Sequence, residues 1–212
     1  MLPITIDGLN NDGVCAYIDE CGRGCYAGPV CAAAVVWPCN YLPENDSEKK
    51  LLGMIKDSKK VSEKNREILS EFIKKTAIKY SIACIDNQEI DAINILQATY
   101  KAMHKALDQL QLNIIDHIFV DGNKFKPYIG NDSEYVPHTC IVEGDNKLIQ
   151  IAAASIIAKT YRDKYISDLG NSNPEFKVYN WQKNKGYGTK EHSDAIKQYG
   201  ITQYHRKTFI HF

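Results

Sequence analysis

The order in which strand-like and helix-like segments follow one another narrows the possible folds of this chain more than any other property. Five short segments are rich in β-branched or apolar residues, which is typical of strands. They are Val14–Asp19, Val30–Val36, Ile78–Ile85, Asp116–Val120 and Tyr135–Val142. A Gly-rich turn joins the first two segments, so they are predicted to form a hairpin.

Segments with apolar residues at helical spacing lie between and after the later strands. The predicted helices run from an N-cap at Ser62 to about Thr76, from Gln88 to about Leu110, over Ile149–Ile166 and over Glu191–Tyr199. A polar, aromatic loop is expected over Asn171–Thr189. Early strands followed by alternating helices and strands predict an α/β domain with a mixed five-stranded sheet flanked by helices. We expect a single domain over residues 1–212, in which residues from about 165 to 212 form a small helical extension that binds the substrate.

The composition sets outer limits on the class of protein. With 212 residues, of which 44% are hydrophobic and 25% charged, the chain is long enough to bury the core of one globular domain. No apolar run approaches the roughly 18 residues of a membrane span, so no membrane association is expected. Residues 1–13 lack the basic start and apolar centre of a secretory signal. We therefore expect a cytoplasmic protein.

The seven cysteines are expected to be free thiols in a reducing compartment. Several lie in apolar, strand-like runs, where a thiol behaves as a small hydrophobic side chain. No second Cys or His pair follows Cys21 and Cys25 at the spacing of a zinc site, so free thiols are favoured there over metal ligands. The full set is Cys15, Cys21, Cys25, Cys31, Cys39, Cys84 and Cys140.

The charges are unevenly distributed along the chain. The formal net charge is zero, but residues 155–212 contain ten Lys or Arg and five Asp or Glu, which leaves 10 − 5 = +5. A nucleic acid backbone responds to such a local excess of positive charge. A solvated basic face is the alternative that charge alone leaves open.

Acidic residues stand at the ends of two predicted strands. Asp19 and Glu20 close the first strand, and Asp121 closes another just before a glycine. Carboxylates that converge at one edge of a sheet repel one another, and a divalent cation between them relieves the repulsion. Oxygen ligands without a His or Cys cluster favour Mg²⁺ or Mn²⁺ over zinc. The competing interpretation is that each Asp only caps its turn.

These acidic residues belong to a series of seven blocks that follow one another from about residue 14 to 209. The blocks are Tyr17–Val30, Asp57–Lys60, Ile95–Thr99 with Met103, Val120–Asn123, Gly144–Asp145, Ile151–Lys159 with Arg162–Asp163, and Lys185–Thr189 with His192 and His205–Arg206. In this order they resemble the ribonuclease HII family over nearly the whole chain. The resemblance implies a ribonuclease H-like fold.

The resemblance also implies an activity and a metal site. Members of this family are metal-dependent endonucleases that hydrolyse the RNA strand of RNA/DNA hybrids. They also incise 5′ of single ribonucleotides in duplex DNA, leave 5′-phosphate and 3′-OH ends, and support replication and repair. Carried over to this chain, the catalytic and metal-binding residues are Asp19, Glu20, Asp121 and Asp145, which would hold two Mg²⁺ or Mn²⁺ ions. Asp163 competes for the fourth place, but its position after Arg162 on a helix favours a structural ion pair.

The residues that would bind the substrate follow from the same resemblance. Gly22, Arg23 and Gly24 match a turn whose backbone contacts the 2′-OH of the ribose, the group that distinguishes RNA from DNA. Tyr187 matches the tyrosine that packs on the sugar at the RNA–DNA junction. Lys59 is a candidate phosphate contact, as are Arg23 and Lys159. The expected partners are an RNA/DNA hybrid and ribonucleotide-containing duplex DNA, bound by a monomer.

The chain departs from the family pattern at three places. Cys21 stands where the family usually has Ala, and Asn184 stands where His is common. A short insertion over Lys126–Glu134 precedes Asp145 and could shift it. Three alternatives stay open: a catalytically silent hybrid-binding protein, another enzyme of the ribonuclease H-like superfamily, and a type III enzyme. The last two are not expected to carry Gly22-Arg23-Gly24.

Overall fold

A mixed sheet of five strands forms the centre of the computed structural model, which describes residues 1–3, 13–38, 41–131 and 133–211. Its strands, in spatial order, are β3 (Lys79–Ile85), β2 (Val30–Val36), β1 (Cys15–Cys21), β4 (His117–Asp121) and β7 (His138–Ile141). The pairs β1–β2 and β2–β3 are antiparallel, whereas β1–β4 and β4–β7 are parallel. The predicted mixed five-stranded sheet and the hairpin of the first two strands are confirmed.

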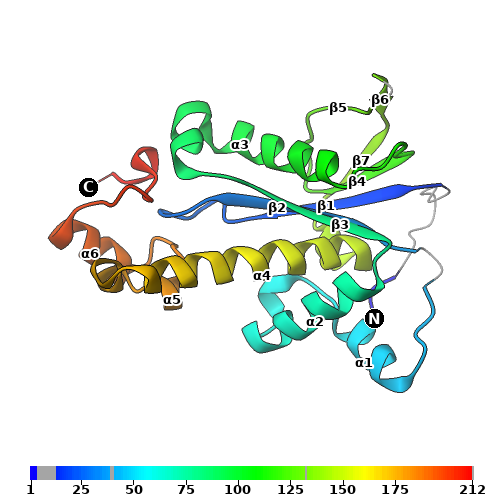
Figure 1. Cartoon of the computed structure of the whole chain (residues 1–212), viewed down its shortest axis with the longest axis horizontal. Helices are drawn as coiled ribbons and strands as arrows, with labels where there is room; N and C mark the ends of the chain where they lie inside the picture. The colour runs from blue at the N-terminus through cyan, green and yellow to red at the C-terminus, as the bar shows by residue number, and fades with distance from the viewer. Residues whose placement is uncertain (4–12, 39–40, 132, 212) are drawn as a thin grey trace.

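Helices cover both faces of this sheet. In Figure 1, α3 (Asn87–Gln109) lies on one face, and α4 (Ile149–Ser172) lies on the other with α2 (Glu63–Thr76) and α1 (Asp46–Met54) beyond it. Alternate residues of the strands pack into separate cores on the two faces of the sheet. Ile18, for example, contributes to the core under α3, whereas Ala33 contributes to the core under α4. The edges of the sheet between these layers are therefore available for a site.

The long helix α4 passes beneath the sheet and is buried along most of its length. Its small residues Ala152, Ala153 and Ala154 are fully buried, which lets the helix backbone approach the strands closely. Polar residues interrupt its apolar character farther on. Among the described residues, no helix is both long and apolar enough to cross a membrane.

Local signals explain where the helices begin and bend. The hydroxyl of Ser62 accepts a hydrogen bond from the N–H of Asn65 and caps α2, as predicted. In α3, Asn94 has a left-handed backbone with φ of 66°, which interrupts the helix. Its side chain accepts from the N–H groups of Leu96 and Gln97, so it caps the continuation of the helix after the kink.

The predictions of other elements need four corrections. The helix α1 was not predicted, and α4 extends six residues beyond the expected end at Ile166. The expected loop over Asn171–Thr189 contains a 3₁₀ helix at Pro174–Tyr179 and α5 at Trp181–Asn184. The segment Tyr135–Val142 is two strands, β6 (Tyr135–Val136) and β7. Pro137 separates them, since it has no N–H to donate to a ladder. The final helix α6 (Lys190–Tyr199) is as expected.

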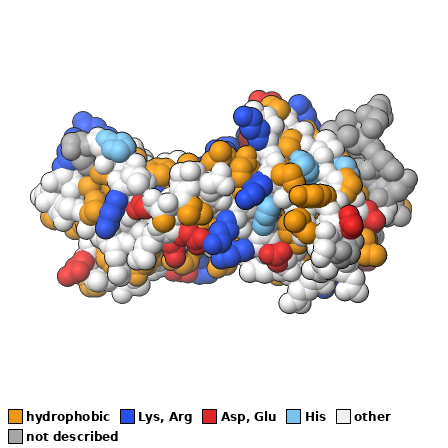
Figure 2. Space-filling view, turned by 90° about the horizontal axis from the view of Figure 1, so that it is seen from above, with side chains coloured by type: hydrophobic (Ala, Val, Ile, Leu, Met, Phe, Trp, Pro, Cys, Tyr) orange, Lys and Arg blue, Asp and Glu red, His pale blue; other side chains and the backbone are white. Residues whose placement is uncertain are grey.

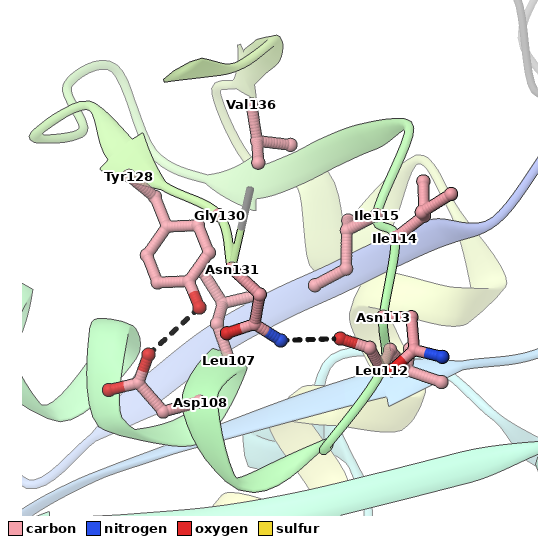
Figure 3. A pocket seen from close by; sticks show the side chains of 10 residues that line it. All are labelled: Leu107, Asp108, Leu112, Asn113, Ile114, Ile115, Tyr128, Gly130, Asn131 and Val136. Carbon is pink, nitrogen blue, oxygen red and sulfur yellow. Dashed lines mark hydrogen bonds between the residues drawn. The ribbon is translucent and has the colours of Figure 1, made fainter. Parts of the chain in front are cut away.

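The insertion before Asp145, Lys126–Glu134, belongs to a separate small hairpin that also includes Tyr135 and Val136. Its strands are β5 (Tyr128–Ile129) and β6, which pair with each other and not with the main sheet. Figure 3 shows how it is attached to the end of α3: the Tyr128 hydroxyl donates to Asp108 over 2.8 Å, and the Asn131 amide donates to the carbonyl of Leu112 over 2.9 Å. A cavity of only about 20 Å³ remains between the hairpin and this end of α3, so the insertion is packed against the core.

The expectation of free thiols is wrong for two cysteines. Cys31 on β2 and Cys84 on β3 are directly opposite in the antiparallel register, with Cα atoms 4.1 Å apart, and form a disulfide. Cys15, Cys21, Cys25 and Cys140 are thiols outside any disulfide, as expected. Cys39 lies outside the described residues. The pairing depends on the register of two strands separated by 53 residues, which the cysteine spacing alone does not reveal.

Candidate active site

Two of the predicted acidic residues lie side by side because of the sheet topology. Strands β1 and β4 are parallel neighbours, with Ile18 opposite Val120, and Asp19 and Asp121 follow these two residues. The Asp121 carboxylate also accepts from the N–H of Gly144 over 2.7 Å. Gly144 begins the short 3₁₀ helix that carries Asp145, so Asp121 fixes the turn that brings Asp145 to the same edge.

One pocket of about 230 Å³ collects every site residue expected from the sequence. Its lining contains the four acidic residues Asp19, Glu20, Asp121 and Asp145, the turn Gly22, Arg23 and Gly24, and the side chains of Lys59, Lys159 and Tyr187. Cys21, Ser58 and Ser155 complete it. The small hairpin of the insertion contributes none of these residues, so the insertion leaves Asp145 among the other carboxylates.

The carboxylates disfavour one another's charge. Burial, followed by the charges of Glu20 and Asp121, raises the pKa of Asp19 well above its usual value. Burial is also the main cause of the raised pKa of Glu20, against which the nearby Arg23 guanidinium acts. Burial and the charges of Asp121 and Asp57 raise the pKa of Asp145 to about 6. The pocket therefore concentrates negative charge that the protein alone does not neutralise.

The donor set fits a hard divalent cation. Carboxylate oxygens are the ligands that Mg²⁺ and Mn²⁺ prefer, and a bound cation would offset the burial and the repulsion that together raise these pKa values. Among the described residues, no group of three or more His, Cys, Asp or Glu side chains is already arranged to hold one ion. Asp19 and Asp145 are nevertheless buried beside the same pocket, where they are available as ligands.

The Gly22–Pro29 segment, called the reader loop below, needs glycine for steric reasons. Gly22 has φ of +86°, and a Cβ there would lie 2.0 Å from Nε of Arg162. At Gly24 the opposite holds, because a Cβ would meet nothing within 4 Å among the described residues. The loop is therefore tightly packed on its inner side at Gly22 and open to an approaching ligand at Gly24.

Tyr187 is presented by a turn, Gly186–Gly188, that packs against the reader loop. The carbonyl of Gly186 accepts from the N–H groups of Tyr26 and Ala27, over 2.8 and 3.2 Å. A Cβ at Gly188 would lie 2.4 Å from the Tyr26 ring, so only glycine fits there. The Tyr187 side chain remains 36% exposed, and Nζ of Lys159 lies 5.1 Å from its ring centre. The aromatic ring thus faces the pocket beside a basic group.

A buried histidine pair supports this turn from behind. The N–H of Thr202 donates to Nδ1 of His205, so the proton of the neutral His205 ring is on Nε2, which donates to Nε2 of His192 over 3.1 Å. Nδ1 of His192 then donates to the carbonyl of Tyr187 over 2.9 Å. Burial lowers the pKa of His192. Burial and the neighbouring His192 together lower the pKa of His205 to about 3. Both rings are therefore neutral near pH 7.

The structure shows what Asp163 and Asn184, the competing and the departing residue, contact. Asp163 forms ion pairs with Arg66 over 3.0 Å and with Lys159 over 2.8 Å, which confirms its expected role as an ion-pair partner. Asn184 is buried, donates to the carbonyl of Tyr179 and accepts from the N–H of Gly186. Asn184 therefore supports the Tyr187 turn where the family commonly has His.

Sequence reasoning missed the contribution of several residues near the pocket. Ser155 donates to Ser58 over 3.0 Å, and both line the pocket. Asp57 is buried, influences Asp145 and accepts from the N–H of Lys59 over 2.9 Å, which shapes the turn that carries this lysine. All three stand inside blocks that the family resemblance had marked, but no charge or spacing in the sequence indicated what they touch.

Comparisons with known proteins agree with the geometry. A family model described as Ribonuclease HII matches residues 16–212. The chain is 51% identical to Ribonuclease HII of Christiangramia forsetii over 191 residues, which cover 90% of this chain and 87% of that protein. It is 45% identical to Ribonuclease HII of Bacteroides thetaiotaomicron over 201 residues, or 95% and 92% of the two chains.

Solved structures confirm the expected ribonuclease H-like fold. The crystal structure of ribonuclease H2 from Pyrococcus horikoshii aligns with a TM-score of 0.69 over 92% of this chain and 93% of that one, at 23% identity. The Bst-RNase HIII structure in complex with Mn²⁺ aligns with a TM-score of 0.66, but covers 88% of this chain and only 63% of that one, at 18% identity. At these identities the likeness concerns the fold.

Proposed function

This chain belongs to the ribonuclease HII family and is therefore a ribonuclease H of type II, a metal-dependent endonuclease of RNA/DNA hybrids, and we propose that it also incises duplex DNA at single embedded ribonucleotides. The cut would fall 5′ of the ribonucleotide and leave 5′-phosphate and 3′-OH ends. One observation carries the proposal: the four carboxylates share a pocket with the open side of the reader loop and the exposed ring of Tyr187. A group that recognises one sugar thus lies beside the groups suited to phosphodiester hydrolysis.

Asp19, Glu20, Asp121 and Asp145 would hold two divalent ions, Mg²⁺ or Mn²⁺. When bound, such ions activate water and stabilise the charge that develops on the phosphodiester oxygens. The protein's own contribution is to keep the carboxylates in place. The β1–β4 pairing and the hydrogen bond from Gly144 to Asp121 serve this purpose.

The four carboxylates are called the acidic wall of the pocket below, and the substrate-binding residues that line the rest of it are called the reading wall. We propose that the backbone of Gly22–Gly24 reads the 2′-OH, that the Tyr187 ring packs on the sugar, and that Lys59, Arg23 and Lys159 contact phosphates. Arg23 lies 3.3 Å from Glu20 and is half exposed, so it can join the acidic wall to an approaching phosphate.

The helical C-terminal region would extend the binding surface. It carries the Tyr187 turn on one side and adds basic residues to the chain's local positive excess. In Figure 2, Lys and Arg side chains are dispersed over the face that is seen and do not gather in one patch. Every residue assigned here comes from one chain, so a monomer suffices. Embedded ribonucleotides arise when DNA is copied, and we propose a role in their removal during replication and repair inside the cell.

The direct test is incubation with a DNA duplex that carries one ribonucleotide, with Mg²⁺ or Mn²⁺ in turn. The expected product is a single nick 5′ of the ribonucleotide, and an all-DNA duplex of the same sequence is the control. Binding of the ribonucleotide duplex without a nick under either metal would indicate a silent binding protein. Cleavage of long hybrids only would contradict the single-ribonucleotide activity.

A further inference from the structure

Two fully buried arginines hold the carbonyl groups of the reader loop. Arg206 donates from Nη2 to Gly22, from Nη1 to Arg23 and from Nε to Gly28, over 2.7, 2.7 and 2.9 Å. Arg162 donates from Nε to Pro29 and from Nη2 to Ala27, over 2.8 and 3.0 Å. We call these two residues the arginine clamp. Five carbonyl oxygens of one loop therefore accept hydrogen bonds from two guanidinium groups.

The clamp also joins the two loops that would grip the substrate. Nη1 of Arg162 donates to the carbonyl of Lys185 over 2.9 Å, immediately before the Gly186–Gly188 turn. On the other side, the N–H of Arg206 donates to the carbonyl of Tyr26 over 2.7 Å. Arg162 thus links the reader loop to the Tyr187 turn, in addition to the direct bonds from Tyr26 and Ala27 to Gly186, and Arg206 fixes the reader loop itself.

Neither clamp residue is explained by ion pairing. Arg162 and Arg206 are 0% exposed, yet within the described ranges no carboxylate forms a salt bridge with either of them. Burial of a charge is costly unless hydrogen bonds replace its hydration, and the loop carbonyls do so here. Burial lowers the pKa of Arg206 to about 10, which still leaves the guanidinium charged near pH 7. Apolar side chains could pack against the loop without the cost of burying two charges. The buried arginines therefore point to a need for the loop carbonyls to face inward.

Peptide geometry supplies that reason. In a trans peptide the C=O and the following N–H point in opposite directions, and no described peptide bond is cis. Because the Gly22 carbonyl points at Arg206, the N–H of Arg23 points away from it. The same holds for the Arg23 carbonyl and the N–H of Gly24. Neither N–H donates to a described residue, and both residues line the pocket.

We propose that Arg206, supported by Arg162, is a positioning residue that turns the N–H groups of Arg23 and Gly24 outward as a pair of donors for a ribose oxygen. The proposal rests on the function proposed above, in which Gly22–Gly24 reads the 2′-OH. It adds the residue that orients the reading groups. It also assigns a role to Arg206, which the sequence blocks had marked but to which no chemistry had been given.

The test compares binding of two DNA duplexes that differ only in one ribonucleotide, in EDTA so that no cleavage occurs. The wild-type protein is expected to bind the ribonucleotide duplex more tightly. Arg206→Lys keeps the charge but cannot reproduce the planar fork that reaches three carbonyls. In this variant the ratio of the Kd for the all-DNA duplex to the Kd for the ribonucleotide duplex is expected to fall about tenfold, as for weakened pairs of hydrogen bonds. The Kd for the all-DNA duplex itself should change little.

Arg66→Lys is the matched control, since Arg66 is also buried and donates to the backbone carbonyls of Ser58 and Val61, outside the reader loop. It should lose stability but keep the ribonucleotide preference. If the wild-type protein shows no preference, reading of the 2′-OH fails and the proposed function with it. If the wild-type protein has a preference that Arg206→Lys retains in full, the clamp inference is wrong and the proposed function stands.

A wild-type measurement decides the case in which Arg206→Lys does not fold. Amide resonances of Arg23 and Gly24 in ¹⁵N-labelled protein are followed during titration with each duplex. Both should shift more strongly with the ribonucleotide duplex than with the all-DNA duplex. Equal shifts with the two duplexes would overturn the proposal.

Discussion

The two walls of the pocket differ in how their polar groups are balanced. On the acidic wall, burial and mutual repulsion raise the pKa values of Asp19, Glu20 and Asp145. On the reading wall, the carbonyls of the reader loop and of the Tyr187 turn already have donors from Arg206, Arg162 and His192. The acidic wall thus carries repulsion that a bound cation would relieve, whereas the carbonyls of the reading wall already have hydrogen-bond donors from the protein. Substitutions on the two walls should therefore separate catalysis, metal binding and substrate preference.

The largest effect is expected from the acidic wall. Asp121→Asn removes a charge beside Asp19 and should reduce cleavage at least 100-fold, as for loss of a metal ligand, because the carboxylates would hold the ions. Affinity for a hybrid should change little, since phosphate contacts supply most of it. Asp19→Asn should behave in the same way. Cleavage rates and hybrid affinity are measured on the same preparations, and more than a few per cent of wild-type activity in either variant would remove these residues from the metal site.

A smaller effect is expected from the reading wall. Tyr187→Ala removes the exposed ring and should slow incision at a single ribonucleotide by about tenfold to 100-fold, the range expected for a lost stacking contact. Tyr187→Phe keeps the ring and loses only the hydroxyl, so it should be milder.

Rates on single-ribonucleotide and all-RNA hybrid substrates give this comparison, with circular dichroism as the folding control. Wild-type incision by Tyr187→Ala would mean that the tyrosine only anchors its loop. The fold and the metal response of this variant should be unchanged, because its carbonyl, not its side chain, accepts from His192.

The contrast between the walls also marks what the sequence can reveal. Strand and helix patterns located the five strands of the main sheet and the N-cap Ser62, because each of these depends on neighbours in the chain. The same patterns placed Asp19 and Asp121 at strand ends, which is correct for Asp121, whereas β1 continues past Asp19 to Cys21 and only its pairing with β4 ends before Asp19. Their positions at one sheet edge then follow from the topology of β1 and β4.

Features that depend on distant backbone contacts could not be predicted. Arg206 is 184 residues from Gly22, and a sequence pattern treats arginine as an exposed charge, not as a buried donor to carbonyls. The Cys31–Cys84 disulfide depends on strand register for the same reason. The family resemblance marked Arg206 and His192, but only the three-dimensional contacts give them a physical role.

A thermal effect should distinguish the walls without any substrate. A divalent ion that binds only the native protein stabilises it, by about 2.7 kcal/mol at 100 times its Kd. For a chain of this size that corresponds to a rise in Tm of roughly 5–10 °C. Tyr187→Ala should show the full rise and Asp121→Asn little of it. Calorimetry of metal-free protein with added Mg²⁺ or Mn²⁺ checks this. A Tm that does not respond to either ion would contradict the proposal that the acidic wall binds a divalent ion.

The smallest expected effect is the pH dependence of stability in metal-free protein, and it tests the raised pKa of Asp145. The pKa of Asp145 is raised to about 6, against 3.8 for the unperturbed group, first by burial and then by Asp121 and Asp57. The native state therefore binds this proton more tightly than the unfolded state does. The stabilisation is complete below about pH 3.8 and is lost as the pH rises through about 6. Asp145→Asn cannot titrate, so the wild-type Tm minus the variant Tm in EDTA should fall between pH 5 and pH 7, by a few degrees at most. Bound Mg²⁺ competes with the proton and should reduce or reverse this fall. A difference in Tm that is constant over this range in EDTA would show that the pKa of Asp145 is not raised in the native protein. The contrast drawn between the acidic wall and the reading wall would then fail for this residue.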